Sequence, residues 1–216
     1  MTQSGECMPT AVIFDFGNVI CHFDNALFLQ RLTSYTDKPY DELESLIYYS
    51  SDLVRRYETG LVTSDAFIES VTRICALSIS RSEFVDAFTG IFSDNHRVIN
   101  LVRMLKTEYA LGLLSNTNEL DYQRAIMTCP VFGLFDSVTT SFHVGALKPA
   151  KRIYEDALQK LQLPAAECIF IDDIPSYVEG ANAIGMKGIQ YTSYERLVSS
   201  LASLGVHVQQ RRTQEP

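Results

Sequence analysis

Short apolar runs alternate with amphipathic segments over most of this 216-residue chain. Apolar runs of strand length lie at residues 11–15, 110–116, 138–141, 168–172 and 188–191. Apolar residues at helical spacing predict helices over 97–107, from about 118 to Pro130, and over 150–161, 176–184 and 194–204. Continuous apolar strands joined by helices are typical of a parallel sheet covered on both faces. The predicted fold class is therefore α/β, with a doubly wound parallel sheet.

Residues 24–93 interrupt this alternation, because they carry almost no strand signal. Apolar residues recur there at helical spacing, first Phe67, Val71, Ile74 and Cys75, then Phe84, Phe88, Ile91 and Phe92. Ser80 and Glu83 have the spacing of a capping box. We predict an all-helical insertion over 24–93 and an α/β core over 1–23 and 94–216. An insertion directly after the first strand is well placed to cover a site and to select its substrate.

The composition is that of an ordinary globular protein, with 46% hydrophobic and 20% charged residues. A formal net charge of −8 without a long basic run argues against nucleic acid or an anionic membrane as the main partner. No apolar stretch approaches the about 18–20 residues that cross a bilayer, and the polar segment 1–10 lacks a signal-peptide core. The five cysteines are scattered without metal-binding spacing. We therefore expect buried, reduced thiols in a cytoplasmic protein that is a monomer or a homodimer, with a frayed polar tail over 207–216.

Polar side chains that can carry chemistry follow four of the predicted strands. The first strand ends in Asp15, and Gly17 lets the chain turn sharply after it. The other strands lead to Ser115, Asn116 and Thr117, to Lys148, and to Asp172 and Asp173. Because the carboxyl ends of parallel strands meet at one edge of the sheet, we expect this set to converge. Close carboxylates repel each other unless a divalent cation lies between them, and hard oxygen ligands favour Mg²⁺.

This set suits phosphoryl transfer to a carboxylate. A lysine balances the charge of the nucleophile and the phosphate, hydroxyl or backbone N–H groups hold phosphate oxygens, and the metal shields the phosphate. Each element alone also has an ordinary structural interpretation, as a turn aspartate, a helix cap or a surface lysine. Asp172 and Asp173 fit that interpretation least, because adjacent carboxylates at the end of a buried strand are costly unless compensated. The ordered occurrence of all four elements favours a functional site.

At these residues the chain resembles the haloacid dehalogenase-like hydrolases, most of which are phosphatases. Four ordered motifs carry the resemblance, which covers about residues 11–205: FDFGNVI, LLSNTNE, LKPAKRIY and IDDIPSYVEGANAIG. They are most similar to phosphatases of subfamily IA with a small helical cap, and among these to sugar-phosphate phosphatases that act on glucose 1-phosphate. The resemblance implies a Rossmann-like core and identifies residues 24–93 as the cap.

The resemblance also implies the nucleophile and the metal ligands. Asp15 is the expected nucleophile, which forms an aspartyl-phosphate, and its carboxylate also binds Mg²⁺. The backbone carbonyl of Gly17 joins it at the metal. Asp173 is the expected direct ligand from the last motif, and Asp172 beside it is a supporting or alternate ligand.

Further residues are implied around the phosphate. Ser115 and Asn116 are expected to hold the phosphoryl group, and Lys148 to stabilise Asp15 and the phosphate charge. His22 and Asp24, just past the first motif, are weaker candidates to line the substrate pocket, with Asp24 able to position water. Polar loop residues are the alternative interpretation for both.

Two departures from the family pattern bear on activity. Most phosphatases of this family carry a second Asp two residues after the nucleophile as general acid and base, and here Gly17 stands there. Gly17 cannot protonate a leaving alkoxide, which favours substrates that leave easily, such as an anomeric sugar phosphate, an acyl phosphate or an aryl phosphate. In the last motif Ile174 and Tyr177 occupy places where relatives often have Asn or Asp. Ile174 cannot hydrogen bond or ligate, so a weaker outer shell around the metal is expected.

The leading hypothesis is a Mg²⁺-dependent phosphatase of a small phosphorylated metabolite, acting through a covalent intermediate on Asp15. A haloacid dehalogenase is the first alternative, because halide departs without a general acid. The paired Asp172 and Asp173 argue against it, since dehalogenation needs no metal. A catalytically weak family member with a binding or regulatory role is the second alternative, suggested by Gly17, Ile174 and Tyr177.

Overall fold

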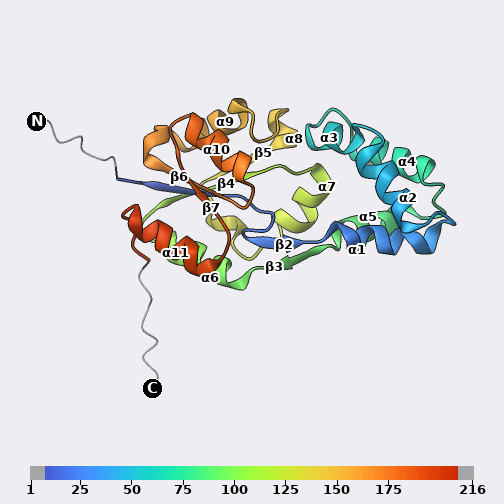
Figure 1. Cartoon of the computed structure of the whole chain (residues 1–216), viewed down its shortest axis with the longest axis horizontal. Coiled ribbons are helices and arrows are strands. Elements are labelled where there is room, and N and C mark those ends of the chain that lie inside the picture. The colour runs from blue at the N-terminus through green and yellow to red at the C-terminus, as the bar shows by residue number, and fades with distance from the viewer. Residues whose placement is uncertain (1–7, 209–216) are drawn as a thin grey trace, which may run out of the picture.

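A five-stranded parallel sheet with strand order β5-β4-β1-β6-β7 forms the centre of the fold (Figure 1). The computed structural model describes residues 8–208. The strands of the sheet are β1 (Ala11–Phe14), β4 (Ala110–Ser115), β5 (Ser137–Thr140), β6 (Cys168–Asp172) and β7 (Lys187–Gln190). The chain adds β4 and β5 on one side of β1 and then crosses to β6 and β7 on the other. The carboxyl ends of β1, β4 and β6 thus meet where the strand order reverses, which is where open α/β sheets bind ligands.

Alternate residues of each strand pack against helices on opposite faces of the sheet. Val12 and Phe14 pack with α6 and α11, whereas Ala11 and Ile13 pack with α9 and α10. Figure 1 shows these two pairs of helices on opposite sides of the strands. The helical segments of this part are α6 (His96–Leu105), α7 (Glu119–Asp121) with the π-helical turn Tyr122–Ile126, α8 (Ser141–Val144), α9 (Lys151–Leu161), α10 (Pro175–Ala183), α11 (Tyr194–Ser203) and the 3-10 turns Phe132–Leu134 and Ala165–Glu167. The predicted doubly wound α/β fold is confirmed.

The segment between β1 and β4 forms a second group of helices with its own hydrophobic core. Its helical segments are α1 (Asn25–Leu32), the 3-10 turn Thr33–Tyr35, α2 (Tyr40–Glu44) with the π-helical turn Ser45–Tyr49, α3 (Leu53–Glu58), α4 (Ser64–Ile74) and α5 (Arg81–Thr89). Phe67 lies at the centre of this core, where its ring stacks on Tyr57 with the ring centroids 4.3 Å apart. The capping box predicted at Ser80 and Glu83 is confirmed at the start of α5.

Two short antiparallel strands, β2 (Cys21–Phe23) and β3 (Phe92–Asp94), connect these helices to the sheet (Figure 1). Sequence analysis missed this ribbon and extended the helical pattern to Phe92, which is wrong because α5 ends at Thr89. Three-residue strands are too short to show an alternating pattern. The boundaries predicted at residues 23 and 94 lie at the ribbon, and the division into core and cap stays a prediction.

The cysteines within residues 8–208 are free thiols, of which Cys21, Cys75 and Cys168 are buried and Cys129 is partly buried. None of the helices in this described part combines the length and the apolar character that crossing a membrane requires. Cys7, nearly all of the polar N-terminal segment and most of the tail 207–216 lie outside the described residues, so the expectations for them stay predictions.

We predict that Phe67→Ala lowers the free energy of unfolding by about 3–5 kcal/mol, because it leaves a cavity among the aromatic rings of the cap helices. Leu61→Ala is the matched control in the same segment, since Leu61 is 69% exposed and its truncation is expected to change stability by no more than about 0.5 kcal/mol. Urea unfolding of both variants checks this, and equal stability of the two would contradict the assigned core.

Candidate active site at the carboxyl edge of the sheet

A small cavity of about 180 Å³ opens at the carboxyl ends of β1, β4 and β6. Its walls include Asp15 after β1, Asn116 after β4 and Asp173 after β6. Lys148, from the loop between α8 and α9, also faces it. The structure thus brings together residues that lie far apart in the sequence, as expected from the convergence of parallel strand ends.

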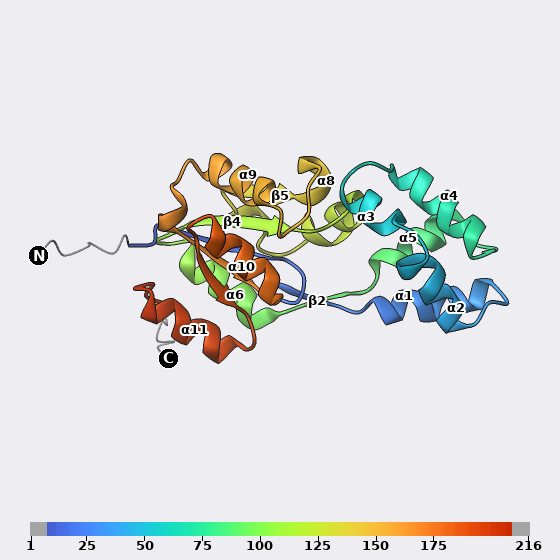
Figure 2. The same ribbon diagram turned by 45° about the horizontal axis from the view of Figure 1, so that its top comes forward.

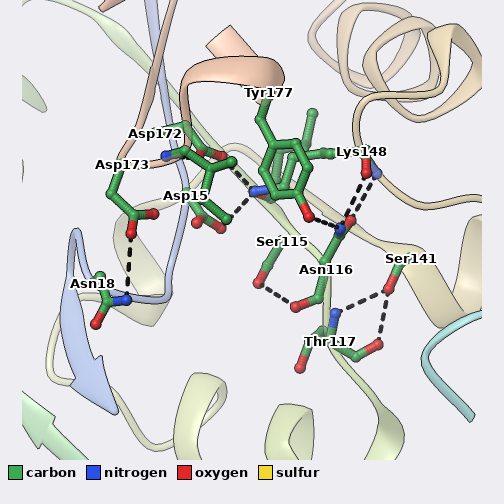
Figure 3. A network of polar contacts seen from close by, with 12 residues as sticks. Asp15, Asn18, Ser115, Asn116, Thr117, Ser141, Lys148, Asp172, Asp173 and Tyr177 are labelled. Carbon is green, nitrogen blue, oxygen red and sulfur yellow. Dashed lines mark hydrogen bonds and ion pairs between the residues drawn. The ribbon is translucent and has the colours of Figure 1, made fainter. Parts of the chain in front are cut away.

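Lys148 lies between two carboxylates at this edge (Figure 3). Its Nζ is 2.8 Å from Oδ1 of Asp15 and 2.6 Å from Oδ2 of Asp172, and its side chain is almost completely buried. Burial opposes the charged form of Lys148, but the two carboxylates outweigh burial and raise the pKa of the ammonium group. Burial also raises the pKa of Asp15 to about 7, although Lys148 acts in the opposite direction. The Lys148 charge therefore stabilises the ionised form of a carboxylate that is largely removed from water.

The amide of Asn116 fixes the backbone that carries Lys148 (Figure 3). Its Oδ1 accepts a hydrogen bond of 2.8 Å from the Lys148 N–H, and its Nδ2 donates to the Lys148 carbonyl at 3.4 Å and to the Tyr177 hydroxyl at 3.3 Å. The Tyr177 ring lies 5.0 Å from the Lys148 Nζ in a cation–π contact. Tyr177, a departure from the family pattern, thus supports the lysine. The role predicted for Asn116 in holding phosphate stays a prediction.

Three carboxylates cluster beside the lysine, since Asp15, Asp172 and Asp173 each offer an oxygen within 4.8 Å of the others. Asp172 is fully buried, and its oxygens are occupied by Lys148 and by the Ile174 N–H, which donates at 2.8 Å. Asp173 is only partly buried and accepts a hydrogen bond of 3.3 Å from the Asn18 amide (Figure 3). Burial and the neighbouring Asp172 raise the pKa of Asp173, so both oppose its ionised form. Oxygen ligands in this arrangement fit a hard divalent cation, with Asp15 and Asp173 the more available donors.

Gly17 lines the cavity beside Asp15, and its surroundings explain why no side chain is present. A Cβ atom placed on Gly17 would lie 2.9 Å from Cε1 of Phe23. The Phe23 ring thus occupies the space into which an acidic side chain at position 17 would project. Ile174 also lines the cavity and is 39% exposed, so it contributes an apolar wall where relatives often have a polar residue.

Ser115 is the last residue of β4 and is 3% exposed. Its hydroxyl donates to the Asn116 carbonyl at 3.3 Å. The next turn is held by Ser141, whose Oγ accepts from the Thr117 N–H and donates to the Thr117 carbonyl, both at 2.9 Å. The loop after β4 is therefore held by the first residue of α8, which follows β5 directly.

A second cavity, of about 300 Å³, lies between the sheet edge and the cap helices. Most of its walls are aromatic or aliphatic, and Tyr48, Asn118 and Asp121 add polar groups. Four residues line both cavities, which are therefore neighbours: Gly17, Phe23, Glu58 and Asn116. The larger cavity is a suitable space for the part of a ligand that extends away from Asp15.

The two weaker pocket candidates are not among the residues that line either cavity. His22 is exposed on β2, where it pairs with Ser93, and its neighbour Phe23 faces the cavities instead. Asp24 caps α1 by accepting a hydrogen bond of 2.9 Å from the Ala26 N–H. The expectation that His22 and Asp24 line the substrate pocket is therefore corrected. Side chains alternate between the two faces of a strand, so His22 points away from the cavities that Phe23 lines. The Asp24 carboxylate is occupied in capping α1.

Sequence analysis missed two carboxyl groups that face the larger cavity, Glu58 at the end of α3 and Asp121 at the end of α7. Burial raises the pKa of each to about 7. In the sequence both resemble solvent-facing helix residues, and no motif distinguishes them. Only the packing of the cap helices against the sheet edge turns them inward.

A family model described as haloacid dehalogenase-like hydrolase matches residues 9–185. A phosphatase of Mycobacterium tuberculosis, named MT3486, is 29% identical over 91% of this chain and 95% of its own length. A D-ribitol-5-phosphate phosphatase of Bacteroides thetaiotaomicron is 24% identical over 83% of this chain and 90% of its own length.

The fold is also found among solved structures. A family enzyme from Bacteroides thetaiotaomicron, bt-2542, crystallised with magnesium and inorganic phosphate, superposes with a TM-score of 0.77 and 16% identity. The alignment covers 88% of this chain and 98% of that structure. With the family match spanning most of the chain and the expected motifs converging at one sheet edge, the chain belongs to the haloacid dehalogenase-like hydrolases.

Proposed function

We propose that this protein is a Mg²⁺-dependent phosphatase that hydrolyses a small phosphorylated metabolite through an aspartyl-phosphate on Asp15. The ion pair of Lys148 with Asp15 and Asp172, next to Asp173, carries the proposal. Two curated relatives that align over most of their length are named as phosphatases, which supports the same reaction class. The carboxylate cluster disfavours dehalogenation, since a metal-free reaction gains nothing from three adjacent acids.

Asp15, Asp173 and the Gly17 carbonyl are the groups that would hold Mg²⁺, with Asp172 behind them. A divalent cation supplies charge neutralisation there, which lets an anionic carboxylate approach an anionic phosphate. The bt-2542 structure with magnesium and phosphate supports this choice of metal. The chain's own donor set points the same way, because it is built from carboxylate and carbonyl oxygens without a soft ligand.

The remaining roles, which are nucleophilic attack, charge stabilisation and phosphate binding, fall to residues of the chain itself. The Asp15 carboxylate attacks phosphorus, while Lys148 favours the ionised form of Asp15 and stabilises the negative charge of the phosphoryl group. Ser115 and the backbone N–H groups after it bind phosphoryl oxygens. The buried position of Lys148 makes its charge more effective, because the surroundings respond less to it than water does.

The substrate class follows from the larger cavity and from Gly17. A volume of about 300 Å³ suits a small metabolite rather than a macromolecule. Aromatic walls with Asn118 and Asp121 between them suit a sugar, which stacks on rings and hydrogen bonds through its hydroxyls. Because Gly17 supplies no acid, a sugar phosphate whose oxygen leaves readily, such as an anomeric phosphate, is the substrate that the site could cleave without a proton from any other residue. The name of the D-ribitol-5-phosphate phosphatase supports a phosphorylated sugar derivative.

Mg²⁺ binding is expected to stabilise the folded protein, because the cation relieves repulsion among the three carboxylates. At 100 times the dissociation constant the gain is about 2.7 kcal/mol, which raises the melting temperature by roughly 5–10 °C in a chain of this size. Asp173→Asn should remove most of this shift. Asp94→Asn, at an exposed carboxylate of the ribbon, should keep it. Thermal unfolding with and without Mg²⁺ measures both, and a full shift in Asp173→Asn would exclude Asp173 as a ligand.

Asp15→Asn should reduce phosphate release from any ester to background, because an amide oxygen is too weak a nucleophile to form the acyl phosphate. The fold should persist, since Asp172 still pairs with Lys148. Steady-state phosphate release with Mg²⁺ tests turnover, and circular dichroism checks folding. Activity near that of the unchanged protein would rule out the covalent route through Asp15.

A further inference from the structure

Glu58 occupies a place that the family pattern does not account for. It is the last residue of α3, and its partly buried side chain lines both the small cavity at Asp15 and the larger cavity under the cap helices. None of the other residues that α1–α5 contribute lines the small cavity among the described residues. A carboxyl group from the cap helices therefore reaches the junction at which a substrate's leaving group would meet its phosphate.

Contacts on both sides of Glu58 hold α3 against the core. The hydroxyl of the preceding Tyr57 accepts a hydrogen bond of 3.3 Å from the Leu120 N–H, at the start of α7. After Glu58, Gly60 adopts a positive φ of 70°, and a Cβ atom there would lie 2.3 Å from the Phe142 carbonyl oxygen of α8. Figures 1 and 2 both show α3 beside α8. Only glycine permits this close approach, which fixes where Glu58 enters the site.

The surroundings of Glu58 suit proton transfer near neutral pH. Burial raises its pKa to about 7, and the positive charge of Lys148 acts in the opposite direction. Glu58 in turn raises the pKa of neighbouring acids on other elements, namely Tyr48, Asp121 and Tyr177. A carboxyl group in this environment can both give and accept a proton at physiological pH.

Position 17, which also lines the small cavity, supplies no acid, because Gly17 stands there and Phe23 fills the adjacent space. Asp121 is the other buried carboxyl of the region, but it lines only the larger cavity. Its hydrogen bonds to Asn118 further tie it to the start of α7. Glu58 is thus the acid from the cap helices that is placed beside Asp15 and Lys148.

We propose that Glu58 is the catalytic proton donor for the leaving group, in place of the acid that Gly17 cannot provide. The inference rests on the proposed phosphatase function. As Asp15 forms its bond to phosphorus, the bond from phosphorus to the ester oxygen breaks, and that oxygen keeps the electron pair and takes the proton of Glu58. Water then attacks the aspartyl-phosphate and gives a proton to the Glu58 carboxylate, and the bond between phosphorus and Asp15 breaks. The net reaction is hydrolysis, with Asp15 and Glu58 regenerated.

The variant Glu58→Gln tests this step. The quantity to compare is kcat/KM for an aryl phosphate and for an alkyl phosphate, both with Mg²⁺. This parameter covers only the steps up to formation of the phosphoenzyme, in which the leaving group departs. For the alkyl ester we expect a loss of about 10²–10⁴-fold, which is the usual contribution of general acid catalysis. For 4-nitrophenyl phosphate the loss should stay below about tenfold, because nitrophenolate leaves without a proton. Equal losses for the two esters would overturn the proposal.

Asp121→Asn is the matched control, because it also neutralises a cavity carboxyl. Because it removes no proton donor from the small cavity, it is expected to change the ratio of kcat/KM between the aryl and alkyl esters far less than Glu58→Gln does. Glu58→Asp should recover part of the alkyl activity that Glu58→Gln loses, which a purely structural role of the side chain would not explain. If Asp121→Asn changed the ratio as strongly as Glu58→Gln, the assignment of the proton to Glu58 would be wrong.

The pH profile supplies an independent readout. In the unchanged protein, the pH profile of kcat/KM for the alkyl ester should rise as the nucleophile ionises and then fall on a descending limb, since only protonated Glu58, whose pKa is about 7, can donate. This descending limb should disappear in Glu58→Gln, and its persistence would contradict the proposal. If the unchanged protein cleaved neither ester, both the phosphatase function and this inference would be overturned. If it cleaved both esters but Glu58→Gln lowered them equally, only the role of Glu58 would be overturned.

Discussion

The buried ion pair network of Lys148 with Asp15 and Asp172 is the constraint on which the rest of the site depends. Burying three charged groups is costly, and only their mutual attraction with good hydrogen bonding compensates for it. The Leu114 carbonyl accepts a hydrogen bond from the Lys148 Nζ, and the Ile174 N–H donates to Asp172. Asn116 holds the Lys148 backbone, so the same network fixes the loops after β4 and β6. The network places the Asp15 carboxyl next to a cavity and beside a cation that favours its ionised form, which is the form that the proposed nucleophile requires.

The groups at the candidate site come from two parts of the molecule, the sheet edge and the cap helices. The carboxyl ends of β1, β4 and β6 present the charged groups, and the cap helices supply the aromatic walls and Glu58. The contacts of α3 with α7 and α8 therefore bear on the site, because they hold the helix that ends in Glu58, the proposed proton donor. Phe23, at the end of the ribbon strand β2, lines both cavities.

The departures from the family pattern acquire physical explanations in this arrangement. The Phe23 ring covers the face of Gly17 where an acid would stand, and Glu58, at the end of α3, lines the same cavity. Tyr177 hydrogen bonds with Asn116 and lies over Lys148, so it supports the charged network from the side. Gly17 and Glu58 line the same small cavity, so the proposed proton donor comes from the cap helices rather than from the strand.

Much of this protein is determined by local pattern. Apolar runs in the sequence predict the five strands. Because parallel strands end at the same edge of the sheet, the residues that follow them meet there: Asp15, Asn116, Lys148 and Asp173. Tertiary packing alone determined three features. They are the ribbon β2–β3, the position of Glu58 at the cavities and the position of His22 away from them. The physical reason is that a three-residue strand and a lone helical glutamate carry no periodic signal. Their environment is set by contacts between segments far apart in the sequence, such as Gly60 against Phe142.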